Sequence, residues 1–385
     1  MKIVFVTANF FSAKAFALPL AIGCEQISDV ILVGNFSREE ARKLECMSQE
    51  KISIKSIPLV RRPHFWSDAV ALIKLIVLFL REQPDIVHSI TPKSGLLTQL
   101  AGFLVCVPVR LHTFTGQVWQ NFKGLKRDFF ILLDKLIVRL CTVPLSDGFE
   151  QTHFLKSSGV VKVAEEISVI GSGSIAGIDF DRIDAPIKIP DVIQGFGSRE
   201  DVFIILFMAR ITKDKGIDVL MESFIELSRR HPKVKLVIVG PDEEGLVESI
   251  QLRKYPNVVV HDYVDDPLPF IKSCDIFVSP SFREGFPMTL LSVLAVGKPA
   301  FVSDIHGHRE LVEFGDETFL HQPGNSSQLI EQIDTFLIEP DVDHHVMPGS
   351  KVFEHFERRN FINQYLCFLL NQLNSANFSR GMRRH

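Results

Sequence analysis

The sequence predicts an α/β protein with two Rossmann-like domains, each built on a doubly wound parallel sheet. Apolar runs of strand length alternate with amphipathic segments of helix length, which is typical of repeated β-α-β units. This alternation occurs twice, and glycine, proline and small polar residues are concentrated between the two series. With 385 residues, 46% of them hydrophobic, the chain can fill two cores.

The expected strands are short apolar runs, and helices are expected between them. In the first half the strands are expected at residues 3–6, 30–33, 86–88 and 110–113. In the second half they are expected at residues 202–207, 234–239, 258–261, 276–278 and 300–302. An amphipathic helix is expected over residues 353–373, followed by a frayed basic tail at 380–385.

The boundary between the domains is expected near residue 190. Residues 171–177 and 188–197 are rich in glycine, proline and small polar residues, which is typical of a linker region. The prediction is therefore a first domain over 1–190, a second over 191–350 and a C-terminal segment over 351–385.

Charge and cysteine usage limit the classes of function. The net charge is -4, but residues 1–190 hold 22 Lys and Arg against 18 Asp and Glu, while residues 191–385 hold 20 against 28. A mildly basic first half suits an anionic membrane or a diphosphate, and nothing indicates nucleic acid. The six cysteines have no paired spacing, which argues against a zinc site and a disulfide framework. Since an apolar strand begins at once, we expect no signal peptide and a cytosolic protein.

Two cations and one carboxylate follow expected strands in the second half. Arg210 and Lys215 follow the run at 202–207, so both would project from its carboxyl end, with room for a diphosphate between them. Glu284 follows the run at 276–278 and precedes a helix, where the turn would aim backbone N–H groups at an anion and the carboxylate could hold sugar hydroxyls. The pattern predicts a nucleotide-sugar site. The alternative is two ordinary surface cations and a carboxylate that favours a helix N-terminus.

These residues carry a family resemblance. Arg210 with Lys215, the run Glu284-Gly285-Phe286-Pro287, and Gly307 with Glu310 resemble family-four retaining glycosyltransferases of the GT-B fold. Four upstream segments resemble a subgroup that builds bacterial surface polysaccharides, namely residues 88–95 (HSITPKSG), 112–119 (HTFTGQVW), 123–127 (KGLKR) and 171–179 (GSGSIAGID). The resemblance implies two domains facing a cleft and a C-terminal helix that crosses back to the first domain.

The resemblance also implies residue roles. Arg210, Lys215 and Glu284 would be catalytic, with the two cations stabilising a leaving diphosphate, one of whose oxygens takes the acceptor's proton. The resemblance implies no metal, because cations and helix amides stabilise the leaving diphosphate, and no cofactor besides a UDP-sugar as co-substrate. The residues expected to bind the donor are Thr115, Gly116, Gly285, Phe286, Pro287, Met288 and Ser292.

Two of these positions depart from the family pattern. The usual motif has a second glutamate eight positions after the first, where it binds the ribose hydroxyls, and Ser292 stands there. Losing that carboxylate costs about 1.5–3 kcal/mol of nucleotide affinity, unless another residue takes over. Many relatives have a histidine, which contacts the 6-hydroxyl of the donor sugar, where this chain has Thr115 before Gly116. Thr115 therefore indicates a 6-deoxy sugar, as in transferases of N-acetylfucosamine-like sugars, whereas His112 is expected to be a satisfied strand residue.

The acceptor is expected at another strand-to-helix turn. Lys93, Ser94 and Gly95 would present a cation and helix N–H groups to an anion, and the resemblance implies a polyprenyl-diphosphate-linked saccharide. The alternative is a plain capped helix.

Two stretches bear on membrane contact. Residues 69–80 are apolar except Lys74 and too short to span a bilayer, so we expect a core helix, with contact to lipid as the alternative. Residues 126–139 suit either docking on anionic lipid or a solvated face. Arg127, Lys135 and Arg139 are expected on one face of that helix, near Phe129, Phe130 and Ile137.

Together these features predict a retaining, metal-independent glycosyltransferase at the inner face of the plasma membrane. It would move an N-acetylated 6-deoxyhexose from UDP to a lipid-linked glycan during synthesis of a bacterial O-antigen or capsule. One alternative is a nucleotide-sugar epimerase, for which no acid/base set can be assembled. The other is a degenerate protein that binds a glycan or a partner enzyme without turnover, which Ser292 and Thr115 would allow.

Overall fold

The computed structural model describes residues 1–59, 65–198, 201–315, 317–338 and 350–382. The chain forms two compact units, Met1–Gly177 with Arg358–His385, and Ile178–Glu357. The second unit begins before residue 190 because the segment ahead of that position contributes to its core: Ile178 and Ile183 pack there together with Ile193.

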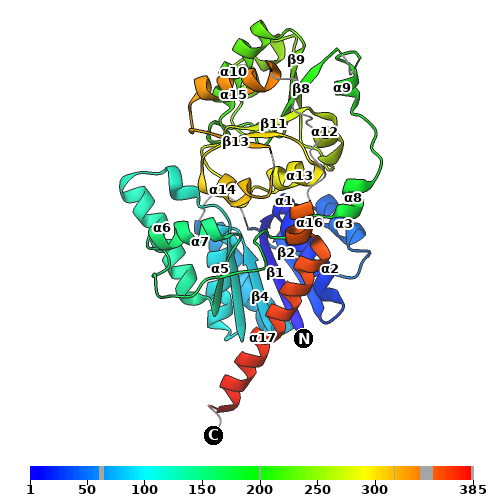
Figure 1. Cartoon of the computed structure of the whole chain (residues 1–385). Helices are drawn as coiled ribbons and strands as arrows, with labels where there is room; N and C mark the ends of the chain where they lie inside the picture. The colour runs from blue at the N-terminus through cyan, green and yellow to red at the C-terminus, as the bar shows by residue number, and fades with distance from the viewer. Residues whose placement is uncertain (60–64, 199–200, 316, 339–349, 383–385) are drawn as a thin grey trace. The chain divides into compact units, whose positions relative to one another are not determined.

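The first unit contains a parallel sheet of seven strands in the order β3-β2-β1-β4-β5-β6-β7 (Figure 1). Its strands are β1 (Lys2–Asn9), β2 (Asp29–Asn35), β3 (Ser53–Ser56), β4 (Ile86–Ile90), β5 (Val109–Phe114), β6 (Val143–Ser146) and β7 (Ser168–Val169). The chain runs outward from β1 in one direction and returns to β4 on the other side, so the carboxyl ends of β1 and β4 form a topological switch point.

Helices cover both faces of this sheet. The helices of the unit are α1 (Phe10–Ser12), α2 (Leu18–Glu25), α3 (Arg38–Met47), α4 (Phe65–Glu82), α5 (Pro92–Leu104), α6 (Gly124–Leu140), α7 (Phe149–Ser157) and α17 (Arg358–Met382). Side chains alternate along β1, so Ile3 and Phe5 pack on one face with α2 and α17, whereas Val4 and Val6 pack on the other with α4 and α5.

The second unit repeats this topology with a parallel sheet of six strands in the order β10-β9-β8-β11-β12-β13. The strands are β8 (Phe203–Met208), β9 (Val234–Val239), β10 (Val258–His261), β11 (Ile276–Ser279), β12 (Ala300–Ser303) and β13 (Thr318–His321). The helices are α8 (Phe180–Asp184), α9 (Asp191–Gln194), α10 (Ile217–Arg230), α11 (Leu246–Ser249), α12 (Leu268–Ser273), α13 (Met288–Val296), α14 (His306–Val312), α15 (Ser326–Ile338) and α16 (Ser350–Phe356). Its switch point lies between β8 and β11.

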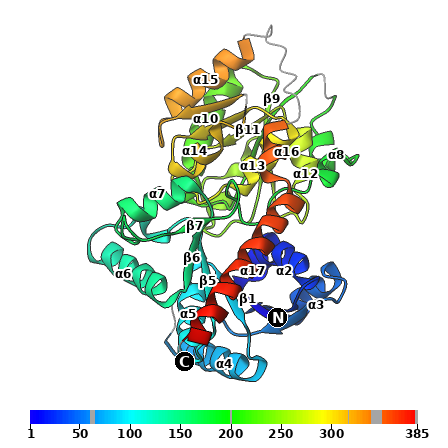
Figure 2. The ribbon, with the colours of Figure 1, turned by 60° about the horizontal axis from the view of Figure 1, so that its bottom comes forward.

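The C-terminal region differs from the expected single helix over 353–373. Two helices, α16 and α17, are separated at Glu357, which forms an isolated parallel bridge with Ile178. The prediction of a frayed tail over residues 380–385 is wrong for residues 380–382, which belong to α17. Residues 383–385 lie outside the described part. Helix α17 packs beside α2 in the first unit (Figure 2).

The helix expected as a core element at 69–80 is only half buried. Helix α4 buries Ala71, Leu75 and Phe79, but it exposes Ile73 and Leu80. The prediction of a core helix is therefore wrong for one of its faces, because apolar side chains surround the helix on more sides than the sheet can cover. Within the described ranges, no helix combines the length and the hydropathy that crossing a membrane requires.

Candidate functional site

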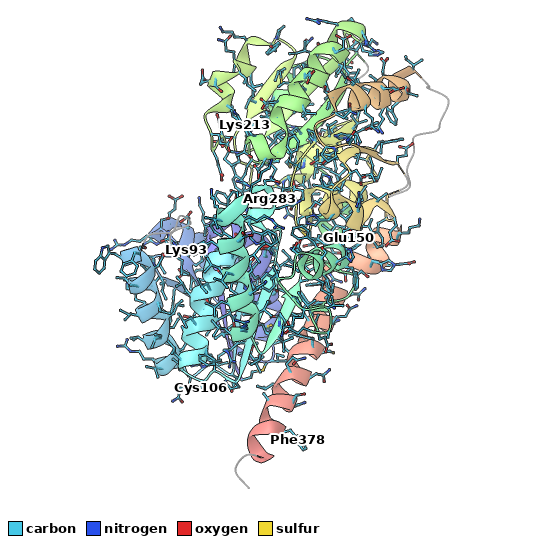
Figure 3. All side chains as sticks on the ribbon, turned by 90° about the vertical axis from the view of Figure 1, so that its left-hand side faces the viewer. Lys93, Cys106, Glu150, Lys213, Arg283 and Phe378 are labelled. Carbon is cyan, nitrogen blue, oxygen red and sulfur yellow. The ribbon has the colours of Figure 1, made fainter. Side chains whose placement is uncertain are left out.

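The strongest candidate site lies at the switch point of the second unit. The loop after β8 carries Arg210 and Lys215, and the loop after β11 carries Glu284. Because β8 and β11 are adjacent parallel strands, their carboxyl ends meet at one edge of the sheet, where open α/β sheets bind ligands. Figure 3 labels Lys213 and Arg283, which come from these same two loops.

Lys215 and Glu284 form a close ion pair across the two loops. The Lys215 Nζ lies 2.6 Å from Glu284 Oε1 and also donates to the Arg283 carbonyl at 3.1 Å. Lys215 is only 8% exposed, and Ser281 donates a further hydrogen bond to Glu284 Oε1 at 3.0 Å. Burial alone would raise the pKa of Glu284, but the Lys215 ammonium and these hydrogen bonds hold it below its usual value. The carboxylate is therefore ionised at neutral pH.

Arg210 lies at the more open side of this loop. Its Nη1 contacts Glu243 Oε2 at 2.7 Å, and its Nη2 lies 3.9 Å from Asp214 Oδ2. Asp214 also accepts a 2.8 Å hydrogen bond from Arg283. Burial would raise the pKa of Asp214, yet the hydrogen bond from Thr212 and the neighbouring cations lower it. Each of the two predicted cations is thus paired with a carboxylate.

Two glycines allow the loops to approach closely. Gly216 has φ +74, a conformation that favours glycine, and a Cβ there would lie 2.1 Å from the Pro280 carbonyl oxygen. A Cβ on Gly307 would lie 2.2 Å from the Gly285 carbonyl oxygen. Side chains at either position would push apart the segments that position Lys215 and Glu284.

A buried histidine supports the same edge and was not found from the sequence. His308 is fully buried on α14, where its Nδ1 donates to the Ser303 carbonyl at 2.8 Å and its Nε2 lies 3.3 Å from Ser279 Oγ. Burial lowers the pKa of His308, although the Glu284 carboxylate opposes this shift. A lone histidine in a sequence gives no signal of such a role.

The remaining donor-binding candidates differ in what they can offer a ligand. Phe286 is 7% exposed and its ring packs in the core with Phe356, so only its backbone faces the loop region. Met288 begins α13, one turn before Ser292. The Ser292 hydroxyl donates to the Met288 carbonyl at 3.0 Å, a bond within its own helix.

At the carboxyl edge of the first sheet, the three residues of the expected acceptor turn have different partners. Lys93 is held 2.6 Å from Asp68 Oδ1, which connects α5 to α4. The Ser94 hydroxyl is buried and donates to the Ile90 carbonyl at 2.6 Å, while Gly95 leaves space for the ring of His112. Ser94 and Gly95 therefore shape the turn, and Lys93 supplies its charge.

The same turn contains a strained residue. Thr91 has φ +87, which is rare for a β-branched residue, and its hydroxyl lies 2.8 Å from that of Ser94. Strained backbone concentrates at functional sites, so the conformation of Thr91 favours a functional role for the turn in addition to capping the helix.

Thr115 and Gly116 follow β5 at this edge. Thr115 is partly exposed, and Gly116 has φ +35, so the chain turns directly after the strand. The next residue, Gln117, is 1% exposed, and neither atom of its carboxamide has a hydrogen-bond partner in the described part of the chain. Gln117 could not be identified from the sequence, since a glutamine beside a glycine forms no distinctive pattern.

Two histidines of the first sheet are structural. The Nδ1 of His88 contacts Tyr365 Oη at 2.6 Å, and His112 Nδ1 lies 2.9 Å from Ser89 Oγ. Burial lowers the pKa of each ring to about 3, and for His112 the neighbouring His88 adds to the effect. Both are neutral, hydrogen-bonded strand residues. Across the described ranges, no cluster of His, Cys, Asp and Glu is suited to hold a metal ion.

Comparison with known proteins gives the class of this site. Residues 189–351 match the family described as glycosyl transferases group 1. The chain is 31% identical over 286 residues to the capsular polysaccharide biosynthesis glycosyltransferase CapM of Staphylococcus aureus, covering 73% of this chain and 74% of CapM. It is 32% identical over 259 residues to the N,N'-diacetylbacillosaminyl-diphospho-undecaprenol α-1,3-N-acetylgalactosaminyltransferase of Campylobacter jejuni, covering 66% and 68%.

A solved structure agrees with the fold. HepE of Anabaena in complex with UDP-glucose superimposes with a TM-score of 0.77 at 18% identity, covering 96% of this chain and 100% of HepE. The two parallel-sheet domains are those of a GT-B glycosyltransferase, as the sequence predicted. The chain belongs to the glycosyl transferases group 1 family and is a glycosyltransferase.

Proposed function

We propose that this protein is a retaining glycosyltransferase that moves a sugar from UDP to a polyprenyl-diphosphate-linked glycan in bacterial surface polysaccharide synthesis. The observation that carries the proposal is the Lys215–Glu284 pair, with Arg210 nearby, at the switch point of the second sheet. Relatives named for capsule synthesis and for transfer to diphospho-undecaprenol saccharides support the acceptor class. Because the proposed acceptor is linked to a lipid, the protein would act at the cytoplasmic face of the plasma membrane.

In the proposed mechanism the protein supplies charge and position. Arg210 and Lys215 hold the diphosphate as negative charge grows on it during cleavage of the sugar–phosphate bond. Each such donor is worth about 3–4 kcal/mol of transition-state stabilisation. One oxygen of the leaving diphosphate takes the proton of the acceptor hydroxyl, so the reaction needs neither a metal nor another cofactor. Glu284, fixed by Lys215 and Ser281, accepts hydrogen bonds from the sugar hydroxyls.

The donor sugar in this proposal is an N-acetyl-6-deoxyhexosamine. Thr115 presents a methyl group and a small hydroxyl where many relatives place a histidine. A methyl at C6 of the sugar needs no hydrogen-bond partner, whereas a buried imidazole facing it would be left unsatisfied.

In the proposed acceptor site, Lys93 contacts the diphosphate of the lipid-linked saccharide. Lys93 is the charged member of a turn with strained backbone at Thr91, at the switch point of the first sheet. Its pairing with Asp68 keeps the ammonium in place before the acceptor binds.

A second candidate is a degenerate transferase that binds nucleotide or glycan without turnover. The observation in its favour is Ser292, whose hydroxyl bonds within α13 at the position where the family pattern has a glutamate. Release of UDP that depends on a lipid acceptor separates this candidate from the enzyme.

Stabilisation against heat by UDP-, GDP- and dTDP-sugars tests the nucleotide assignment. A ligand at 100 times its dissociation constant adds about 2.7 kcal/mol to the free energy of unfolding, so a UDP-sugar should raise the melting temperature by several degrees. The shift should be lost in Arg210→Ala but kept in Lys213→Ala, an exposed cation of the same loop. Stabilisation by GDP- or dTDP-sugars instead of UDP-sugars would overturn the assignment of the nucleotide.

A further inference from the structure

Helix α4 exposes a continuous apolar stripe. Trp66, Val70, Ile73, Val77 and Leu80 are spaced by three or four residues, which places them on one side of the helix. Trp66 is 73% exposed and Ile73 is 61% exposed. These side chains lie opposite those that α4 buries against the sheet, so the stripe is not part of the core.

Helix α6 carries a second stripe of the same kind. Its exposed members are Leu125, Phe129, Leu132 and Leu136, again at helical spacing. Ile137, which was expected near the docking face, is 1% exposed and belongs to the core. The exposed face of α6 is therefore rotated from the one expected, but it is apolar.

Helix α5 lies between the two helices that carry these stripes. It packs against α4 and against α6, and the three helices run side by side in Figure 3. At its C-terminal end α5 exposes Phe103 and Leu104. We call this layer the α4–α5–α6 face. Exposed apolar patches larger than a few hundred Å² are rare on soluble proteins and mark interaction sites.

The charged residues of this face are mainly basic. Lys74 and Arg81 of α4 are exposed, as are Lys126 and Arg139 of α6 and Lys123 just before it. The acidic residues of α4, Asp68 and Glu82, are held in ion pairs with Lys93 and with Lys2 and Lys55. Asp128 is the exposed carboxylate of α6. Apolar stripes flanked by lysine and arginine are complementary to an anionic bilayer surface.

We propose that the α4–α5–α6 face docks on anionic lipid, with Trp66 and Phe129 inserted at the level of the headgroups. Helices of a doubly wound sheet begin at the carboxyl edge, so Trp66, Lys93 and Phe129 all lie near that edge. Docking by this face brings the Lys93 turn to the membrane surface, where a polyprenyl diphosphate presents its charge. The link between docking and the lipid-linked acceptor rests on the proposed function.

Sedimentation of the full-length protein with lipid vesicles tests the docking surface. Vesicles containing phosphatidylglycerol should bind the wild type, whereas pure phosphatidylcholine vesicles should bind it at least tenfold more weakly. Trp66→Ser/Phe129→Ser should weaken binding to the anionic vesicles at least tenfold, because two large apolar side chains are no longer transferred from water into the lipid. Lys123→Gln/Lys126→Gln should weaken it about fivefold for each charge removed.

Phe378→Ser is the matched control. Phe378 is 69% exposed on α17, and α17 packs on the other face of the first sheet (Figure 3). The variant should bind vesicles as the wild type does. Equal loss of binding in Phe378→Ser and Trp66→Ser/Phe129→Ser would overturn the assignment of the face.

Tryptophan fluorescence provides a second readout. The chain has two tryptophans, and Trp119 is 1% exposed, so a change of solvent contact falls on Trp66. Phosphatidylglycerol vesicles should shift the emission of the wild type to shorter wavelength and leave that of Trp66→Phe unshifted. An unshifted wild type would contradict insertion of Trp66.

The proposal is also overturned by a lack of binding to anionic vesicles or by full binding of the Trp66→Ser/Phe129→Ser variant. It is overturned as well if the wild type dimerises in the absence of vesicles and this variant does not. The last would assign the face to a second copy of the chain. Vesicle binding needs neither donor nor acceptor. Binding without sugar transfer contradicts the proposed function alone, and transfer to a short-chain acceptor without vesicle binding contradicts this inference alone.

Discussion

At the scale of single residues, the burial of Lys215 determines how the candidate site works. A charge that is 8% exposed is stable only with a partner and hydrogen bonds, and Glu284 with the Arg283 carbonyl supplies both. Arg210 is different, since its pair with Glu243 is about one-third exposed and contributes little to stability. The two cations that share a proposed role therefore differ in their structural role.

Replacing either cation should reduce turnover by about 100-fold or more, because each stabilises charge that develops on the diphosphate. Lys215→Ala should also lower the melting temperature, since it leaves the Glu284 carboxylate without its buried partner. Arg210→Ala should leave the melting temperature close to that of the wild type. Steady-state kinetics and thermal unfolding check both variants, with Lys213→Ala as the control. Near-normal turnover in Lys215→Ala and Arg210→Ala would refute the diphosphate assignment.

Glu243 forms an ion pair with the Arg210 guanidinium, the group that is proposed to bind the diphosphate. Glu243→Gln should therefore tighten UDP binding by up to about fivefold, the range of an exposed ion pair. Calorimetric titration with UDP measures the change. Glu244→Gln is the control, because Glu244 accepts a hydrogen bond from the Lys213 backbone N–H instead. Weaker UDP binding by Glu243→Gln would show that Glu243 helps to hold the nucleotide.

The 6-deoxy proposal depends on Thr115. A hydroxyl placed without a partner in an apolar niche costs about 1–3 kcal/mol, so the wild type should prefer a 6-deoxy donor by about 5- to 150-fold in kcat/KM. Thr115→His should reduce this preference, since an imidazole binds O6 and crowds a methyl group. Competition between UDP donors matched at every other carbon provides the measurement. Equal use of both donors by the wild type would refute the proposal.

At the scale of elements, most strands could be predicted from the sequence, including the edge strand β10, whereas β3, β6, β7 and β13 could not. Strands β1, β8 and β11 contain continuous apolar runs because helices cover both faces of each sheet. Strand β3 (SIKS) is polar at the sheet edge, and β6 (VPLS) contains a proline. Such strands are formed by pairing with a neighbour, which a local apolar pattern does not reveal.

The candidate site shows the same division. Arg210, Lys215 and Glu284 follow predicted strands, so their common location at one sheet edge follows from topology. Asp214, Arg283 and His308 belong to the same network, but their roles depend on loop packing that no spacing rule describes. The break between α16 and α17 likewise depends on the bridge between Glu357 and Ile178, which are far apart in the sequence.

Helix α13 allows the missing carboxylate to be tested. Ser292 donates to the carbonyl four residues earlier and is partly exposed, so glutamate can replace it without losing a partner outside the helix. Ser292→Glu should lower the KM for the UDP-sugar about tenfold or more if the absent carboxylate only weakens ribose binding. Initial rates over a range of donor concentrations give this value. Loss of activity with unchanged stability would show that the pocket is built around serine.

At the scale of the whole molecule, the chain uses one strand order twice. Both sheets follow the 3-2-1-4-5-6 order of the Rossmann fold, and the first adds β7 at its edge. Each unit has cores of its own, and the chain passes between the units at residues 177–178 and again at 357–358. Each sheet therefore provides a separate switch point, one proposed for the acceptor and one for the nucleotide-sugar.

A transfer assay with a UDP-sugar and a polyprenyl-diphosphate-linked saccharide, followed by NMR of the glycolipid product, tests the proposed reaction most directly. One UDP should be released for each sugar transferred, and the product linkage should have the same anomeric configuration as the donor. Arg210→Ala should yield at least about 100-fold less product in the same time. A product of inverted configuration would contradict the retaining mechanism. Binding of UDP without acceptor-dependent release would contradict the assignment as an active transferase.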